Sequence, residues 1–155
     1  MPMDSSGMEQ LKIQFTAFQR KHYVFTKRFL LKMAFRALAQ TKKLTPIDNG
    51  NLINNWELTD VIRSGSNLSI YLINSSYYAS FVEEGHWQHK RWLPGSFKGN
   101  KFVYKRGSKD GIMLQEKWIE GHFMATISIA KINKEIPQRY NKEFTAFIRE
   151  LNMNN

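Results

Sequence analysis

The sequence predicts a single α+β domain over residues 1–155, with a long N-terminal helix, a small antiparallel sheet with a protruding basic hairpin or loop, and C-terminal helices. Residues 8–43 contain neither Gly nor Pro and repeat apolar side chains every three or four positions, as an amphipathic helix does. Short β-branched and apolar runs follow, separated by glycine-bearing turns. A chain of 155 residues with 42% hydrophobic content is long enough for one domain with a core.

The helix predicted over 8–43 carries one apolar stripe. The stripe consists of Leu11, Phe15, Phe18, His22, Phe25, Phe29 and Met33. Thr45 and Pro46 end the helix, because the residue before a proline avoids helical dihedral angles. At 1.5 Å per residue, 35 residues would reach roughly 50 Å, which is longer than a domain of this size needs. We therefore expect part of this helix to project or to pack on a neighbouring subunit.

Residues 44–85 are predicted to form a turn, a hairpin and a short helix. Asn49 and Gly50 are a strong turn pair. Strands are expected over 56–62 and 68–73, joined by the glycine-bearing link 63–67. A short helix over 77–84 is expected to end at Gly85 in the left-handed conformation.

Residues 86–111 are predicted to be a basic loop or arm, in which 101–105 form one strand of a protruding hairpin. Residues 112–155 are predicted to form C-terminal helices, the first beginning near Met113 and carrying Trp118 and Phe123 into a core. Pro137 should break or kink this first helix, because proline lacks the backbone N–H that a helix interior needs.

The net charge of +10 is unevenly distributed. Residues 1–43 hold nine Lys and Arg against two acids, and residues 86–109 hold seven against none. Between them, residues 44–85 hold one Arg against five acids. Such segregation suits a phosphate-bearing partner, or copies of the chain placed acid to base. There is no Cys and no run of 18 apolar residues, so we expect no disulfide, no thiolate metal site and no membrane partner.

A cluster of carboxylates and histidines lies at Glu83, Glu84, His86 and His89. A metal ion would need three or four of these ligands to converge, and Gly85 interrupts the helix that would bring them together. Catalysis of the kind found in metal-free ribonucleases is the other chemical hypothesis. It would use His22, His86, His89 or His122.

The favoured interpretation of this cluster is structural. No nucleophile motif or phosphate-binding loop accompanies the histidines. We expect Tyr78, Phe81 and Val82 to be core residues, with Glu83 at the end of the helix. The sequence thus predicts no catalytic residue, no metal and no cofactor.

The basic segment offers six candidate contacts to a partner or to DNA. They are Lys90, Arg91, Lys98, Lys101, Lys105 and Arg106. Aromatic residues are interleaved with them, and such a pattern can follow a phosphate backbone and stack on bases. The alternative is a hairpin arm that holds a neighbouring subunit while its lysines stay in water. The apolar content of the segment favours this second interpretation.

Three ordered motifs carry a resemblance to a known family. They are "TPIDNGNL" (45–52) followed by Trp56, "YYASFVEEGH" (77–86) and "WIEGHFM" (118–124). Over residues 8–135 the chain resembles the small tail-component or neck (tail-completion) proteins of long-tailed bacteriophages and prophages. The matching positions are Pro46, Asp48, Gly50, Leu52, Tyr78, Ala79, Phe81, Val82, Glu83, Gly85, His86, Gly121, Phe123 and Met124, with Trp118 opening the third motif. Asn49 replaces the usual Thr, and 88–110 is a longer basic insertion.

The resemblance implies a structural virion protein, assembled in the host bacterial cytoplasm, whose ring joins the DNA-filled head to the tail. Its implied partners are copies of itself in a six-fold or twelve-fold ring, a connector or head-closure protein, and a tail terminator or tube protein. DNA passing through the channel is a further implied contact. The alternatives are a tail terminator that caps the tube, and a nonspecific nucleic-acid-binding protein or small nuclease.

Overall fold

The computed structural model describes residues 5–48 and 50–153, with the side chains of residue 10 and of those from residue 12 onward. The chain folds as two compact units. The first unit combines the residues up to Ser75 with those from Met124 onward, and the second unit is Ser76–Phe123. The sheets are antiparallel, and the predicted α+β class is confirmed.

The first unit contains α1 (Ser5–Leu44), α2 (Asn51–Asn54), β1 (Trp56–Leu58), β2 (Ile62–Ser64), β3 (Asn67–Ser69), β4 (Leu72–Asn74) and α4 (Met124–Met153). The second contains α3 (Ala79–Glu84), β5 (Gly85–Gln88), β6 (Arg91–Lys98), β7 (Lys101–Tyr104), β8 (Gly111–Leu114) and β9 (Lys117–Glu120). In the described part of the chain, no helix has the length and apolar character that crossing a membrane requires.

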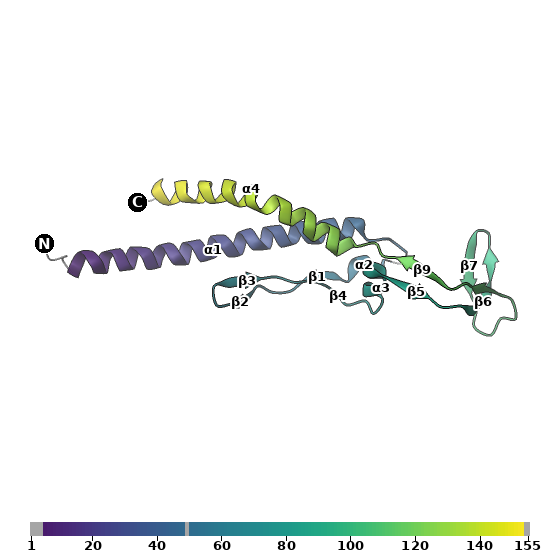
Figure 1. Ribbon diagram of the computed structural model, residues 1–155. Coiled ribbons are helices and arrows are strands. Elements are labelled where there is room, and N and C mark those ends of the chain that lie inside the picture. The colour runs from purple at the N-terminus through teal and green to yellow at the C-terminus, as the bar shows by residue number, and fades with distance from the viewer. Residues whose placement is uncertain (1–4, 49, 154–155) are drawn as a thin grey trace. The chain divides into compact units, whose positions relative to one another are not determined.

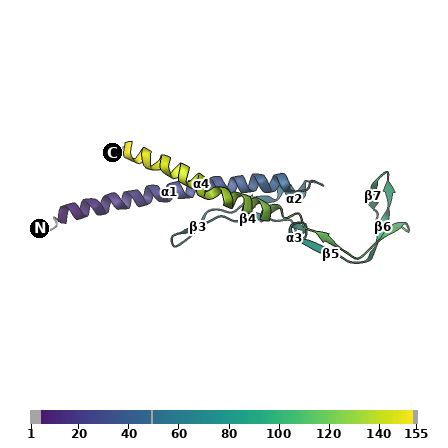
Figure 2. The same cartoon turned by 45° about the horizontal axis from the view of Figure 1, so that its top comes forward.

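In the first unit, α1 and α4 lie side by side in opposite directions (Figures 1 and 2). The predicted stripe of α1 faces α4, and its members Phe29 and Met33 are buried together with Ile132 of α4. Farther along, the rings of Phe25 and Phe147 stack with centroids 4.8 Å apart. The apolar periodicity of the sequence thus corresponds to a helix–helix interface.

Ion pairs flank this interface. Lys32 pairs with Glu143 at 2.7 Å, and Glu135 pairs with both Arg36 (2.9 Å) and Arg139 (2.8 Å). The hydrogen bond from Arg139 holds the pKa of Glu135 below its ordinary value of 4.5; desolvation opposes this, and Arg36 reinforces it. Because these side chains are substantially exposed, the ion pairs contribute little to stability.

The predicted hairpin is present. β1 pairs with β4 and β2 with β3, so the pairing extends from Trp56 opposite Asn74 to Ser64 opposite Asn67. The turn is therefore shorter than the predicted link 63–67. At this end the Arg63 guanidinium lies 5.0 Å from the centre of the Tyr23 ring on α1. This cation–π contact holds the hairpin along the helix.

The prediction of a helix from residue 113 is wrong, because β8 and β9 occupy this range. The helix begins only at Met124, after Phe123 with a positive φ of 48°. Pairing of β8 with β6 and of β9 with β5 overrides the helix-like spacing of the apolar residues. Trp118 and Phe123, predicted to be core residues, are 47% and 44% exposed.

Pro137 was predicted to break or kink the helix, and of these two effects the break is absent, because α4 continues through this residue to Met153. The expected pair of C-terminal helices is therefore a single helix. Proline removes one backbone hydrogen bond, which leaves the Asn133 carbonyl without its helical donor. Figure 1 shows that α4 changes direction near its middle, as a proline inside a helix favours.

Candidate interaction surfaces

The first family motif joins the end of α1 to the hairpin. Trp56 is buried, and its indole N–H donates to Thr45 Oγ1 at 3.0 Å. The Thr45 hydroxyl in turn donates to the Thr41 carbonyl at 2.7 Å. The Asn74 side-chain amide donates to the Leu52 carbonyl at 2.8 Å and connects α2 with β4. These contacts stabilise the change of direction after α1.

Other residues of this motif have simple structural places. Leu52 is buried, and Gly50 has a φ of 80°, which favours glycine, directly before α2. Pro46 and Asp48 are exposed on the loop. Asn49, the other half of the predicted turn pair, lies outside the described residues.

The second and third motifs meet in the second unit. The backbone N–H of His122 donates to the Val82 carbonyl at 2.8 Å, and that of Phe123 to the Glu83 carbonyl at 3.0 Å. A Cβ at Gly121 would lie only 2.3 Å from the Glu83 carbonyl oxygen. Glycine is therefore required at Gly121, because any side chain would separate α3 from the segment that follows β9.

Gly85 ends α3 and begins β5, opposite Glu120 of β9. Its φ of 87° confirms the predicted positive value. Its ψ of 173° differs from that of the predicted left-handed helical conformation, so this part of the prediction is wrong. The observed pair of φ and ψ is accessible almost only to glycine and leads into an extended strand. A Cβ here would lie 2.6 Å from the Ile119 carbonyl oxygen.

The residues of the carboxylate–histidine cluster do not come together as a set of metal ligands. Among the residues that the structure describes, no three His, Asp or Glu gather where they could hold a metal ion. The His86 ring packs edge-on against Phe81 at 5.5 Å, and its Nδ1 is buried without a hydrogen-bond partner. His89 and His122 are exposed, and His22 belongs to the first unit.

The prediction that residues of α3 form a core is corrected for Phe81, which is 52% exposed. Tyr78 and Val82 are half-buried. The reason is that the second unit, every residue of which is described, buries no large hydrophobic side chain. Its strands form separate sheets of two and three strands.

Aromatic side chains occupy the surface of this second unit. Trp87 and Trp118 face each other across the β5–β9 ladder with rings 5.8 Å apart. Phe97 pairs with Phe102 across β6 and β7 at 5.3 Å. The exposed members of this aromatic surface are Trp87 (59%), Trp92 (49%), Phe97 (61%), Tyr104 (58%) and Trp118 (47%).

The predicted hairpin arm corresponds to β6 and β7, paired from Gly95 opposite Tyr104 to Lys98 opposite Lys101. The six candidate contacts Lys90, Arg91, Lys98, Lys101, Lys105 and Arg106 are exposed on and around it. No carboxylate of the described residues pairs with them within 4 Å. The arm thus presents unneutralised cations beside exposed aromatic rings.

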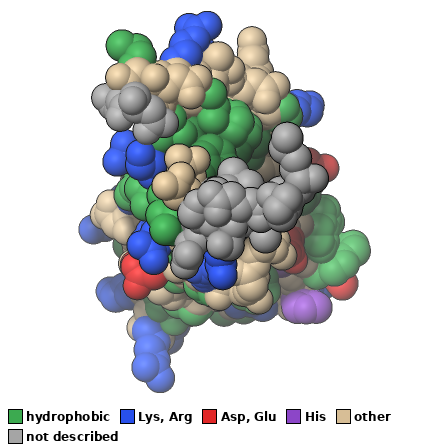
Figure 3. Space-filling model, turned by 90° about the vertical axis from the view of Figure 1, so that its left-hand side faces the viewer, with side chains coloured by type: hydrophobic (Ala, Val, Ile, Leu, Met, Phe, Trp, Pro, Cys, Tyr) green, Lys and Arg blue, Asp and Glu red, His purple; other side chains and the backbone are tan. Residues whose placement is uncertain are grey.

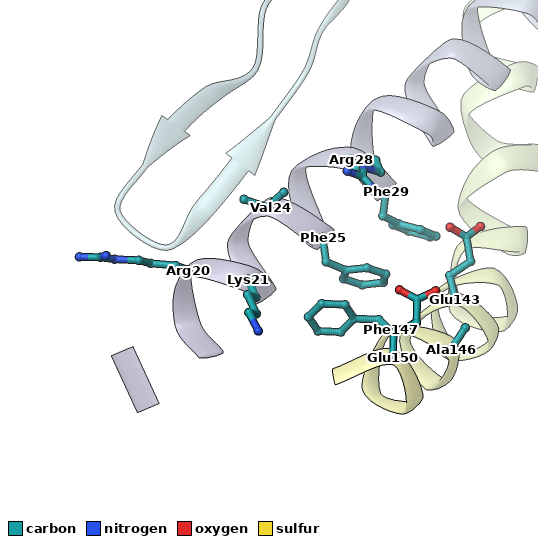
Figure 4. A pocket seen from close by; sticks show the side chains of 10 residues that line it. All are labelled: Arg20, Lys21, Val24, Phe25, Arg28, Phe29, Glu143, Ala146, Phe147 and Glu150. Atoms are coloured by element: carbon teal, nitrogen blue, oxygen red, sulfur yellow. The ribbon is translucent and has the colours of Figure 1, made fainter. Parts of the chain in front are cut away.

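A second surface lies in the first unit, where the sequence predicted no site. An open groove of about 550 Å³ lies between α1 and α4, with walls formed by Phe25, Phe29 and Phe147 (Figure 4). Glu143 and Glu150 of α4 form one rim of this helix groove, and Arg20, Lys21 and Arg28 of α1 form the other. Figure 3, which views this end of the helix pair, shows hydrophobic side chains at the surface among Lys and Arg. The signal for this surface in the sequence was the length of the helix predicted over 8–43, part of which was expected to project or to pack on a neighbouring subunit.

Comparison with known proteins identifies the class of protein. The family described as "Bacteriophage HK97-gp10, putative tail-component" matches residues 9–85. The first motif and residues 77–85 of the second lie inside this range, whereas His86 and the third motif lie beyond it. Over residues 9–85 the chain matches this family of phage tail components, and the resemblance predicted from its motifs is confirmed.

Two relatives come from Bacillus subtilis (strain 168). The phage-like element PBSX protein XkdI is 37% identical over 83 residues, which cover 52% of this chain and 48% of the relative. The uncharacterized protein YqbI is 32% identical over 82 residues, which cover 48% of this chain and 44% of the relative. The match thus spans about half the length of each relative. No solved structure matches the chain significantly.

Proposed function

We propose that the chain is a structural, non-catalytic component of a phage neck, and that its copies form a ring that joins the DNA-filled head to the tail. The match of residues 9–85 to a family of phage tail components and the similarity to a protein of a phage-like element support this role. In this proposal the chain resides in the virion, assembled in the host bacterial cytoplasm. A tail terminator that caps the tube is the alternative within the same class.

The aromatic surface of the second unit is the observation that carries the proposal. Seven aromatic side chains, the five of this surface together with Tyr77 and Phe81, stand about half exposed or more on a unit of 48 residues that buries no large hydrophobic side chain. Monomeric soluble proteins rarely leave so much apolar surface in water. Protein interfaces are enriched in Trp, Tyr and Phe, so a protein partner is the occupant that suits this surface.

Charge supports copies of the same chain as one partner. Residues 86–109 carry seven Lys and Arg and no acid, whereas residues 44–85 carry five acids and one Arg. In a closed ring each subunit presents one surface to a different surface of the next subunit, which allows a basic segment to meet an acidic one. The remaining proposed partners are a connector or head-closure protein, and a tail terminator or tube protein. Six-fold or twelve-fold symmetry is part of the proposal.

The exposed cations of the arm favour a second candidate function, which is contact with DNA in the channel or nonspecific nucleic-acid binding. Lys98, Lys101 and Lys105 have no carboxylate partner among the described residues and can neutralise phosphates. Such binding would weaken steeply with salt, with a slope of about −0.9 per neutralised phosphate.

Two variants separate these functions. Phe97→Ser with Tyr104→Ser removes aromatic surface, and reversal of Lys98, Lys101 and Lys105 to Glu removes cations. We expect the first variant to lose ring assembly, measured as particle mass and as restored infectivity of a phage lacking the gene. The charge reversal should impair assembly less. Phe35→Ser, at a 60% exposed position outside the arm, is the control and should assemble normally.

The opposite result would favour the nucleic-acid function. It would consist of micromolar or tighter duplex binding by the parent at about 150 mM salt that the charge reversals abolish. Nuclease activity lost in His86→Ala or His89→Ala would likewise contradict a structural role.

A further inference from the structure

The apolar stripe of α1 continues beyond the part that α4 covers. From His22 to Ala37 the stripe faces α4, whereas residues 12–20 are all exposed. We name residues 12–18, none of which lines the groove, the α1 overhang; in it Ile13 is 65%, Phe15 62% and Phe18 38% exposed. Figure 1 shows α1 running on past the C-terminal end of α4.

The helix groove has the chemistry to receive such a segment. Its walls are the rings of Phe25, Phe29 and Phe147, which point into the space between the helices (Figure 4). An amphipathic helix that binds a groove presents apolar anchors three or four residues apart. Phe15 and Phe18 have this spacing.

The different charges of the two rims constrain the orientation of a bound helix. Residues 10–47 contain no acid, and the α1 overhang carries Lys12. On the α4 rim of the groove, Glu150 has no cation within 4 Å among the described residues, whereas Glu143 already pairs with Lys32. A basic helix is therefore attracted to the α4 rim and repelled by Arg20, Lys21 and Arg28 on the α1 rim.

We propose that the α1 overhang of one copy occupies the helix groove of a second copy of this chain. The overhang cannot fill its own groove, because it continues the same unbroken helix that forms one wall. One contact would cover two apolar surfaces that the isolated chain leaves in water. The inference rests on the proposed self-assembly and adds which surfaces meet.

The test compares two phenylalanines of α1 with nearly equal exposure, in the full-length chain. Phe15, in the overhang, is 62% exposed, and Phe35, outside both the overhang and the groove, is 60% exposed. Phe15→Glu should weaken self-association at least about tenfold in sedimentation or mass photometry, as loss of a central anchor does. Phe35→Glu should change it less than about twofold. Equal effects of the two substitutions would overturn the proposal.

A groove substitution and a cross-link test the other half of the contact. Ala146→Arg places a bulky side chain in the groove and should weaken association as Phe15→Glu does; unchanged association would contradict the proposal. Because the chain lacks Cys, Gln14→Cys, beside Phe15 and Phe18 on the helix, and Ala146→Cys provide unique attachment points. A short bismaleimide should join the two variants when they are mixed, and a mixture of Ala39→Cys with Ala146→Cys should stay unlinked. Failure of the first mixture to cross-link counts against the proposal even if Ala146→Arg fails to fold.

Comparing the groove variants with the arm variants distinguishes the groove contact from the proposed neck role. If Phe15→Glu and Ala146→Arg assemble normally while Phe97→Ser with Tyr104→Ser does not, groove docking is wrong and the neck role stands. A parent chain that stays monomeric at every concentration overturns the groove contact and the self-assembled ring together.

Discussion

Replacing Gly85 with Ala tests how α3 passes into β5. Two separate costs follow from the structure. The backbone at φ 87° and ψ 173° lies in a region that only glycine occupies readily, and forcing alanine into it costs about 1–3 kcal/mol. The new Cβ would also lie 2.6 Å from the Ile119 carbonyl oxygen and 2.8 Å from the Gly121 nitrogen.

These neighbours are backbone atoms that belong to the β5–β9 ladder and the segment after it, so they cannot rotate away as a flexible side chain would. Overpacking of this kind adds about 1–3 kcal/mol. We therefore expect Gly85→Ala to lower the free energy of unfolding by about 2–6 kcal/mol. If the backbone of β9 does not shift to accept the new Cβ, the pairing of β5 with β9 should be lost at this position.

The assay follows the strands directly. Trp87 and Trp118 face each other across the ladder, so their coupled indole transitions report its pairing in circular dichroism during urea unfolding. Gly99→Ala is the matched control, because Gly99 has a φ of 61° and nothing within 4 Å of its Cβ position. It should cost only the conformational term of about 1–2 kcal/mol. A loss at Gly85 no larger than that at Gly99 would show that the close approach to β9 is wrong.

Three further predictions concern the first unit. Met33→Ala should cost about 2–5 kcal/mol in urea unfolding, because Met33 is 2% exposed in the helix interface, whereas Phe35→Ala should stay within about 0.5 kcal/mol. Trp56→Phe should cost about 1–2 kcal/mol, since it removes the N–H donor to Thr45 Oγ1; a Thr45→Val background should reduce this loss, and equal losses in both backgrounds would contradict the bond. Glu135 has a lowered pKa in the folded state, so its stabilising effect is full above the ordinary value of 4.5 and disappears as the pH falls through the folded value. The difference in melting temperature between the parent and Glu135→Gln should therefore narrow on acidification, and a difference independent of pH would refute this assignment.

The long helix and the hairpin could be predicted from the sequence because their signals are local. The stripe through Phe25, Phe29 and Met33 repeats with the helical period, and no Gly or Pro interrupts it. Gly65, with a φ of 60°, marks the hairpin turn. In both cases the residues that determine the structure lie close together in the chain.

The strands β8 and β9 could not be predicted in this way. Each has four residues, too few to show alternation clearly, and Trp118, Ile119 and Phe123 also match a helical spacing. Pairing with β6 and β5, from 17 to 35 residues earlier in the chain, determines their structure. Gly111 and Gly121 were the overlooked signal, since a Cβ at either position would meet a carbonyl oxygen of the neighbouring segment at 2.4 Å or less.

The candidate surfaces were predictable only in part, for a different physical reason. Aromatic residues indicate apolar packing but not whether the packing lies within the chain or between chains. Phe81 and Trp118 were therefore assigned to a core, although the second unit buries no large hydrophobic side chain. The basic arm was predicted because charge segregation remains visible without a structure.

The family motifs and the candidate interaction surfaces are largely different residues, and this separation has a physical basis. Gly85, Gly121 and Trp56 meet requirements of the backbone and the interior that few other residues satisfy. The arm and the α1 overhang need only to expose apolar and charged groups on a strand or helix, and many side chains can do that. A partner surface of this kind leaves little trace in a motif, so the motifs identify the fold while the exposed aromatic residues indicate where a partner binds. Substitutions at Phe15 or Phe97 should leave the free energy of unfolding of the isolated chain nearly unchanged and impair its assembly. Gly85→Ala should lower the free energy of unfolding and also impair assembly.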